Sequence, residues 1–285
     1  MKKHIEVTGA ANWRPLTDKA ESAAWNMAAD EAMLMSHAAE ETPPTLRFYA
    51  WDPAAVSLGY FQRADAEIDR DACTKMGIDV VRRLTGGRAV LHDLEVTYSL
   101  VVNEAEPYIP SGVTASYLFF SRGIAAGLAQ LGIDAQMQAP GAVGASPGGR
   151  GLRSAACFDA PSYYELTVGG RKVVGSAQLR KDGVLLQHGS ILLNFEPERM
   201  VNILRLSDKV ERTVLLQELP QRATGLSEVK GRKVRFAEVA SAVAAGIAYQ
   251  CGLKLTSGER TPAEINRTQE LADRKYSTEE WNLRR

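Results

Sequence analysis

The chain has 285 residues, of which 45% are hydrophobic and 24% are charged, a composition typical of a globular protein that buries a substantial core. Its 34 basic and 34 acidic residues give zero formal charge, which argues against nucleic acid or an anionic membrane surface as a partner. Three cysteines without a Cys-x-x-Cys spacing, and no run of roughly eighteen apolar residues, predict a protein of the reducing cytoplasm with no disulfide framework, metal site or membrane span.

The first half of the chain is expected to begin with a helix and continue with short strands. Apolar residues at helical spacing predict an amphipathic helix over 23–35. Strand patterns follow it at 45–51, 55–60, 80–83, 89–92 and 95–102. A short helix is expected over 65–76 and a second amphipathic helix over 116–131, which ends at Gly132.

The second half opens with a loop and then turns to strands and helices. Segment 138–151 is rich in glycine and proline and predicts a mobile loop. Strands are expected at 163–168, 171–177 and 184–193, joined by tight glycine turns, and helices at 236–251 and 262–275. Strands followed by helices, with tight hairpins, favour an α+β fold with a mainly antiparallel mixed sheet flanked by helices.

A glycine pair with several arginines lies in segment 82–93, Arg-Arg-Leu-Thr-Gly-Gly-Arg-Ala-Val-Leu-His-Asp. Paired glycines let backbone N–H groups approach a ligand, and the three arginines supply fixed positive charge for a phosphate or a carrier protein. A glycine pair after a strand is more often only a turn, and the segment has neither the Walker nor the dinucleotide-binding pattern. The pattern alone therefore indicates a ligand only weakly.

Cys157 precedes a turn-forming stretch, Phe-Asp-Ala-Pro-Ser, and lies fifteen residues before Lys172. A free cysteine is usually a buried small hydrophobe, but polar and turn-forming neighbours make Cys157 more accessible than Cys73 or Cys251. The ordinary thiol pKa is about 8.5, and a nearby ammonium lowers it and raises the thiolate fraction. The pair predicts a thiol nucleophile with a fixed cation, as an acyl-transfer enzyme needs.

These segments together resemble the biotin/lipoate protein ligase superfamily. Its signature Arg-Arg-x-Thr-Gly-Gly-x-Ala-Val-x-His matches 82–92, and Gly-x-Lys-x-x-Gly-Ser-Ala-Gln matches 170–178. Within the superfamily the chain is similar to the octanoyltransferases of the LipM type, through matches at 25–32, 47–53, 57–62, 156–162, 187–190 and 275–282. The resemblance implies one catalytic domain over 1–285, with a core of about 40–252 and a helical C-terminal extension of about 253–285.

The resemblance also implies a mechanism. The Cys157 thiolate takes an octanoyl group from octanoyl-acyl carrier protein, and a lysine of the lipoyl domain of the glycine cleavage H protein then takes it as an amide. Lys172 lowers the pKa of Cys157 and positions the acyl carbonyl. Because the donor is already a thioester, no nucleotide or other cofactor is expected.

Further site residues are expected to surround this pair. The substrate-binding residues are predicted to be Arg82, Arg83, Thr85, Gly86, Gly87, His92, Gly175, Ser176, Ala177 and His188. The oxyanion would be bound by N–H groups of Gly86-Gly87 or of Gly175-Ser176, and His92 or His188 could act as a base, although a lone histidine is more often structural. The apolar slot for the octanoyl chain is expected to be lined by Val81, Leu84, Ala89, Val174 and Ala177.

Three hypotheses remain open from the sequence. The first is the cysteine-dependent octanoyltransferase. The second is an ATP-dependent lipoate-protein ligase, or an amidotransferase that moves octanoyl groups between lipoyl domains. ATP-dependent ligases are not expected to carry a cysteine at the position of Cys157, which favours the transferase. The third is a binding module that keeps the fold to hold an acyl or biotinyl ligand without turnover.

Overall fold

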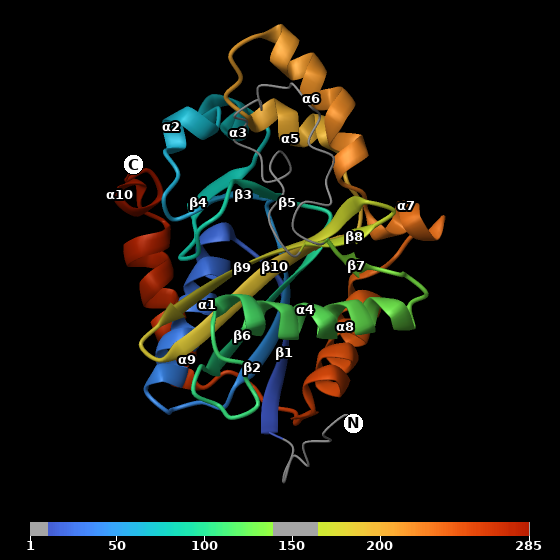
Figure 1. Cartoon of the computed structure of the whole chain (residues 1–285). Helices are drawn as coiled ribbons and strands as arrows, with labels where there is room; N and C mark the ends of the chain where they lie inside the picture. The colour runs from blue at the N-terminus through green and yellow to red at the C-terminus, as the bar shows by residue number, and fades with distance from the viewer. Residues whose placement is uncertain (1–10, 139–164, 285) are drawn as a thin grey trace.

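The computed structural model describes residues 11–138 and 165–284 and contains one large and one small β-sheet. The strands of the large sheet follow one another in the order β11 (Leu253–Leu255), β1 (Ala11–Glu21), β2 (Thr45–Trp51), β6 (Glu95–Asn103), β10 (Val184–Leu192), β9 (Arg171–Lys181), β8 (Leu166–Val168) and β7 (Gln136–Met137) (Figure 1). Strand β1 pairs in parallel with β11 and β2, and the other pairs are antiparallel. The predicted α+β fold with a mainly antiparallel mixed sheet is confirmed.

The small sheet has the order β4 (Asp79–Arg82), β3 (Ala55–Leu58) and β5 (Val90–His92). Strand β3 is parallel to β4 and antiparallel to β5. The strands expected on either side of Asp52-Pro53 therefore belong to different sheets, β2 to the large one and β3 to the small one. The glycine turn between β4 and β5 lies beside the large sheet, where Oγ1 of Thr85 is 2.7 Å from Nε2 of His188 on β10.

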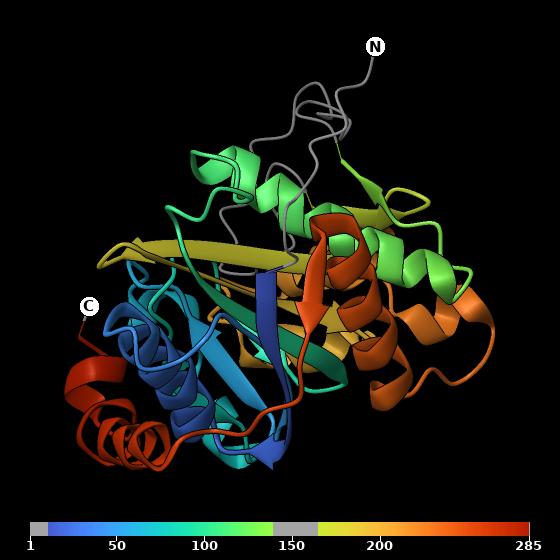
Figure 2. The same cartoon turned by 90° about the horizontal axis from the view of Figure 1, so that it is seen from below.

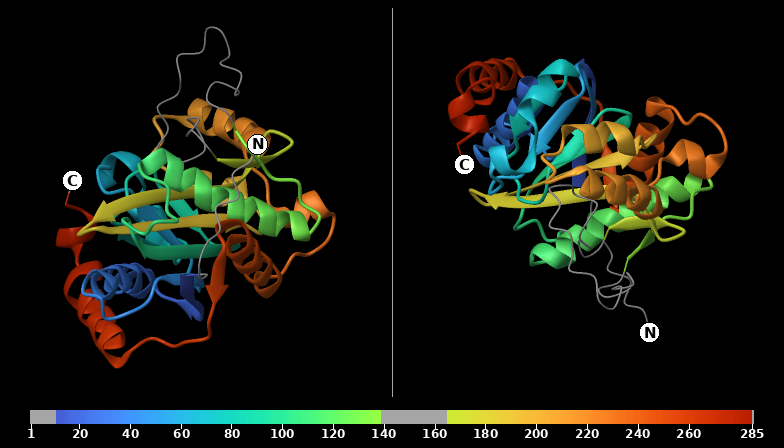
Figure 3. Two further views of the ribbon diagram at one scale, coloured as in Figure 1. Left: turned by 60° about the horizontal axis from the view of Figure 1, so that its bottom comes forward. Right: turned by 90° about the horizontal axis from the view of Figure 1, so that it is seen from above.

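Helices cover both faces of the large sheet, as Figures 2 and 3 show. On one face, α4 (Val113–Gln130) and α8 (Phe236–Cys251) pack with the sheet into the largest apolar cluster. On the other, α1 (Ala23–Ala38) lies against the sheet and is itself covered by α9 (Pro262–Leu271) and the π-helix η1 (Ala272–Tyr276). Both faces of strand β6 are apolar. Its residues Tyr98 and Leu100 belong to the largest apolar cluster, and Val101, which points to the opposite face, belongs to a separate cluster with residues of α1.

Two glycines let α4 and α8 approach closely. A Cβ on Gly246 of α8 would lie 2.2 Å from the backbone nitrogen of Gly127 on α4, so neither position has room for a side chain.

The remaining helices are short or peripheral: α2 (Ala64–Glu67), α3 (Arg70–Lys75), α5 (Pro197–Ile203), α6 (Lys209–Arg222), α7 (Leu226–Lys230) and α10 (Glu279–Asn282). Among the described residues, none of the helices is long and apolar enough to cross a membrane.

The largest differences from the sequence-based expectation are at the helix predicted over 65–76 and at β1. The helix predicted over 65–76 is two short helices, because the Asp69 carboxylate accepts a hydrogen bond from the Ala72 N–H and begins α3 anew. Strand β1 was not predicted at all. Its sequence, with Arg14, Asp18 and Lys19, has no strand alternation, and it forms because β2 and β11 pair with it from both sides.

Buried ion pairs fix β1 and β2 to the helices. Arg47 on β2 is fully buried and donates to Asp18 at 2.6 Å and to Asp30 of α1 at 2.8 Å, while Arg14 binds Glu264 at 2.7 Å. Burial raises the pKa of Asp30, but the hydrogen bond from His188 and the charge of Arg47 outweigh it and hold the pKa below the ordinary value.

Folding stability should therefore fall in acid. Arginine partners also lower the pKa of Asp18 and of Glu264 against the opposing effect of burial. A carboxyl whose pKa is lower in the folded chain contributes stability that is present above its unfolded pKa of about 4 and is lost as the pH falls through the folded pKa. Urea unfolding at successive pH values should show a free energy of unfolding that is level near neutrality and declines below about pH 5.

A matched variant checks the cause of this decline. The double substitution Arg14→Met, Glu264→Leu removes one of the pairs, so its free energy of unfolding should decline less steeply in acid than that of the wild-type chain. Equal slopes for the two proteins would contradict the assignment to Glu264.

Candidate active site

A cavity of about 170 Å³ lies where the small sheet, the large sheet and α1 meet. Eight of the predicted site residues line it: Arg83, Gly87, His92, Lys172, Gly175, Ser176, Ala177 and His188. The pairing of β10 with β9 places His188 opposite Ala177 in the large sheet, whereas Arg83, Gly87 and His92 come from the small sheet and the turn between its strands. Cys157 and residues 139–151 of the predicted loop lie outside the described residues.

Three predicted binding residues do not line the cavity: Arg82, Thr85 and Gly86. Arg82 points away from it and is fully buried, with its guanidinium donating at 2.8 Å to the carbonyl oxygens of Gly59 and Gln62. Its backbone N–H binds the side chain of Asn282 in α10 at 2.9 Å. The structure therefore gives Arg82 contacts that hold the C-terminal helix against the β3–α2 turn.

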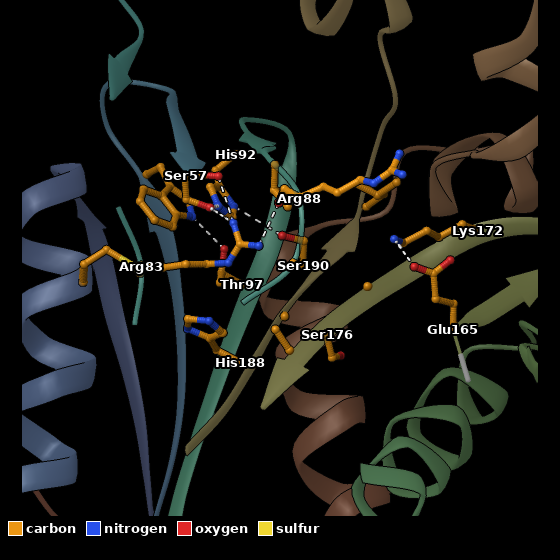
Figure 4. A pocket seen from close by; sticks show the side chains of 18 of the residues that line it. Ser57, Arg83, Arg88, His92, Thr97, Glu165, Lys172, Ser176, His188 and Ser190 are labelled. Carbon is orange, nitrogen blue, oxygen red and sulfur yellow. Dashed lines mark hydrogen bonds and ion pairs between the residues drawn. The ribbon is translucent and has the colours of Figure 1, made fainter. Parts of the chain in front are cut away.

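Lys172 lies at one end of the cavity in a buried ion pair (Figure 4). Its Nζ is 2.5 Å from Oε1 of Glu165, and the two side chains are only 7% and 8% exposed. Lys172 is the second residue of β9, and Glu165 immediately precedes the adjacent β8. The sequence analysis did not identify Glu165. The one signal for it was an acidic residue at the start of the strand that precedes the motif lysine in the hairpin.

His92 lies at the other end, stacked on the indole of Trp51 with ring centroids 4.1 Å apart. Its Nε2 is 2.8 Å from the Ser57 hydroxyl, and its Nδ1 is 2.7 Å from Oε1 of Glu95. The Glu95 carboxylate also accepts a hydrogen bond from Ser190 at 2.8 Å. Both ring nitrogens of His92 therefore have protein partners.

His188 has the same arrangement with different residues. Its Nδ1 is 3.0 Å from Oδ2 of Asp30, and its Nε2 is 2.7 Å from the Thr85 hydroxyl. Asp30 is buried on α1, where Tyr49 and Ser99 also donate to it. Either histidine would have to exchange a partner before it could take a proton from a substrate amine.

The apolar wall of the cavity differs from the one expected. Of the five predicted residues, Ala177 lines the cavity, whereas Val81, Ala89 and Val174 are packed in the core clusters and Leu84 lies against one of them. The apolar and aromatic lining instead comes from Met27, Tyr49, Trp51, Val90 and Leu192. Four of the five predicted residues thus do not line this cavity, because the alternation of a strand alone does not tell which of its two buried faces meets it.

Comparison with known proteins places the chain in a family. A family model described as the lipoyl protein ligase A/B catalytic domain matches residues 22–248. The chain belongs to this family. It is 47% identical, over 96% of its length and 99% of the relative's, to a Kyrpidia tusciae protein named Octanoyltransferase LipM, and 40% identical, over 96% and 98%, to the Bacillus subtilis protein of that name. The resemblance to LipM-type octanoyltransferases is thereby confirmed.

Solved structures of lipoate protein ligases have the same fold. A bipartite lipoate protein ligase of Thermoplasma acidophilum superposes with a TM-score of 0.77 at 26% identity, covering 96% of each chain. A lipoate-protein ligase A bound with ATP gives 0.75 at 26% identity, covering 96% of this chain and 99% of the other. The lipoate protein ligase fold of this chain is thereby confirmed.

The position of Lys172 depends on a glycine of the same strand. A Cβ at Gly175 would lie 2.6 Å from Cε and 2.8 Å from Nζ of Lys172. Lys172 is predicted to act on the reacting groups, so we expect Gly175→Ala to displace its ammonium from Glu165 and to lower the rate of octanoyl transfer about 10- to 100-fold, the order of effect of misplacing such a group by about 1 Å. Initial rates would measure this.

The Gly175→Ala variant should still fold, because the end of a lysine side chain can move, although its melting temperature should fall as the buried pair with Glu165 is weakened. Gly258→Ala is the matched control, since its Cβ would lie 3.0 Å from Cγ of Arg14, away from the cavity. It should keep the wild-type rate. A Gly175→Ala variant as active as this control would show that the position of Lys172 does not limit the reaction.

Proposed function

We propose that this protein is a cytoplasmic octanoyltransferase of lipoate biosynthesis. It transfers an octanoyl group from octanoyl-acyl carrier protein to a lysine of a lipoyl domain, that of the glycine cleavage H protein, through a thioester on Cys157. The observation that carries the proposal is the cavity that brings Lys172 of the second motif and Gly87 of the first into one site. The relatives named Octanoyltransferase LipM, which match nearly end to end, support it.

The first half of the reaction acylates the enzyme. The Cys157 thiolate attacks the carbonyl carbon of the octanoyl thioester, the bond from this carbon to the carrier sulfur breaks, and the carrier leaves as a thiol after taking a proton. The charge of Lys172 lowers the pKa of the Cys157 thiol. Exchange between two thioesters is nearly neutral in free energy, so this step needs no nucleotide.

The second half forms the amide. The neutral amine of the acceptor lysine attacks the Cys157 thioester and forms the N–C bond, the C–S bond breaks to restore the thiolate, and the nitrogen releases one proton to solvent. At pH 7 this amine is almost wholly protonated, because its pKa is about 10.4, and exposing the neutral form costs about 4 to 5 kcal/mol. Desolvation beside Lys172, whose side chain is 7% exposed, lowers this cost by disfavouring a second cation.

Both steps pass through an oxyanion, and the N–H groups of Gly86-Gly87 or of Gly175-Ser176 are the proposed donors. A backbone donor aimed at the oxyanion contributes about 3 to 4 kcal/mol in comparable enzymes. The octanoyl chain lies along Met27, Trp51 and Leu192 in the cavity, where each buried methylene contributes about 0.8 kcal/mol. The site belongs to one catalytic domain over 1–285, with a helical extension near its C-terminal end.

Intact-protein mass spectrometry tests the proposal. The protein is mixed with octanoyl-acyl carrier protein without ATP, and an octanoyl adduct on Cys157 that disappears when H protein is added is the expected result. Acylation of the H protein only from free octanoate and ATP would instead establish a ligase, which the ATP-bound structural relative makes the second candidate. Octanoyl transfer from one lipoyl domain to another would establish an amidotransferase, and no transfer a binding module.

A further inference from the structure

We propose that Arg83 is a positioning residue of acyl transfer, which orients the Gly86-Gly87 turn so that the Gly87 N–H binds the oxyanion, and that it does not itself bind substrate. This inference rests on the proposed octanoyl transfer. It reassigns Arg83, whose place in the first motif predicted a substrate-binding residue, and it chooses the glycine turn as the oxyanion site.

The guanidinium of Arg83 is directed at protein acceptors. Arg83 is 5% exposed, and its Nη2 donates to the carbonyl oxygens of Gly86 at 2.8 Å and Arg88 at 2.7 Å. Its Nη1 donates to Oγ of Ser57 at 3.0 Å and its Nε to Oγ1 of Thr85 at 3.2 Å. All three nitrogens thus hold the chain itself, and two of these contacts hold the carbonyl side of the glycine turn.

The geometry of the peptide bond then fixes where the donors of the turn point. A trans peptide directs its C=O and its N–H in opposite directions. Because the Gly86 carbonyl faces Arg83, the N–H of Gly87, which belongs to the same peptide, points away from the cation. Gly87 has φ of 98°, a conformation that favours glycine, and it lines the cavity. Arg83 therefore occupies the acceptor side of the turn and leaves its donor side for a negatively charged oxygen.

Arg83 is itself held by the two histidine arrays. The hydroxyls of Ser57 and Thr85 both accept from Arg83, and each also lies within hydrogen-bond distance of Nε2 of His92 or His188. Each ring then donates from Nδ1 to a carboxylate, that of Glu95 or Asp30. Two carboxylate–histidine–hydroxyl arrays, from different sheets and from α1, thus converge on one guanidinium and fix its orientation.

The glycine turn also faces the end of the cavity that holds Lys172 and Glu165. In the view of Figure 4, Arg83 lies among Ser57, His92 and Thr97, whereas Arg88 extends from the turn toward Lys172 and Glu165. On its outer side the turn packs against Gly59, where a Cβ would lie only 2.0 Å from the Gly87 carbonyl oxygen. The turn is therefore held from both sides, and a change at Arg83 reaches the oxyanion site without touching the substrate.

The test compares Arg83→Lys with Arg14→Lys in the octanoyl transfer assay. Arg14 is also 5% exposed and also binds buried partners, but it lies outside the cavity, so it controls for the loss of a buried guanidinium. A single ammonium cannot bind both turn carbonyls and both hydroxyls. We expect kcat of Arg83→Lys to fall about 100-fold, as when an oxyanion donor is removed, with the KM for octanoyl-acyl carrier protein nearly unchanged. Arg14→Lys should lower the melting temperature similarly and keep kcat.

A milder pair of variants keeps the proposal testable if Arg83→Lys does not fold. Thr85 does not line the cavity, but its hydroxyl accepts a hydrogen bond from Nε of Arg83. Thr85→Val removes this one hydrogen bond and should therefore lower kcat about tenfold. Thr85→Ser keeps the hydroxyl and should restore most of kcat. Equal rates for Thr85→Val and Thr85→Ser would overturn the proposal.

The remaining outcomes separate this inference from the proposed function. A rise in KM without a fall in kcat for Arg83→Lys would show that Arg83 binds substrate, and equal losses of kcat in Arg83→Lys and Arg14→Lys would show a structural role alone. Either result overturns the positioning role and leaves octanoyl transfer standing. A wild-type protein that transfers no octanoyl group would overturn both.

Discussion

Replacing Cys157 with serine is expected to abolish octanoyl transfer while leaving the fold intact. A serine hydroxyl has a far higher pKa than a thiol, so the charge of Lys172 cannot make it a useful nucleophile at neutral pH. Loss of a covalent nucleophile lowers kcat by about 10⁴-fold or more. Intact-protein mass spectrometry should show no octanoyl adduct on Cys157→Ser, and a circular dichroism spectrum like that of the wild-type chain would confirm its fold.

The other two cysteines provide matched controls. Burial raises the pKa of Cys73 to about 11 and that of Cys251 to about 12, so neither is a thiolate at neutral pH. Cys73→Ala and Cys251→Ala should therefore keep the adduct and the rate. Full activity of Cys157→Ser, or an adduct that moves to another residue, would overturn the thioester on Cys157.

The second large effect is expected from Lys172→Met. The substitution leaves the Glu165 carboxylate buried without its cation, which lowers the free energy of unfolding by about 3 to 5 kcal/mol. It also removes the charge proposed to lower the pKa of the Cys157 thiol, which should return toward about 8.5. Acylation should slow far more than carrier binding weakens, and the remaining rate should rise with pH from pH 7 to above about 8.5.

A double variant separates stability from chemistry. Lys172→Met combined with Glu165→Leu replaces a buried pair by two apolar side chains, which is often neutral for stability. Urea unfolding should show that most of the lost free energy returns, whereas single-turnover acylation should stay as slow as in Lys172→Met. Recovery of the wild-type acylation rate in the double variant would show that Lys172 serves the fold alone.

The helices and hairpins with strong local patterns were predictable from sequence. The helix expected over 236–251 has those bounds in α8, and the strands expected at 171–177 and 184–193 are the hairpin β9–β10 with a longer first strand. Strand β1 could not be predicted in the same way. Its partners β2 and β11 pair in parallel, so its stability comes from residues far along the chain and not from its own alternation.

The same division holds for the site. The motif residues Lys172, His92 and His188 were identifiable because their chemistry and spacing are local properties of the chain. Their carboxylate partners were not, since Asp30 reaches His188 across 158 residues and nothing in the sequence near Asp30 indicates this contact. Glu165 precedes Lys172 by only seven residues, but the β8–β9 hairpin had to bring the two side chains to the same face.

Residue types and their spacing thus indicated the fold class, the motifs and the chemical kinds of the reactive groups. The tertiary structure decided which groups meet: Arg82 faces the C-terminal helix, its neighbour Arg83 faces the glycine turn, and the cavity wall is made by Met27, Trp51 and Leu192. The physical reason is that periodicity and motif spacing encode contacts within a few residues, whereas burial of a charge is settled only by partners that folding brings from other elements.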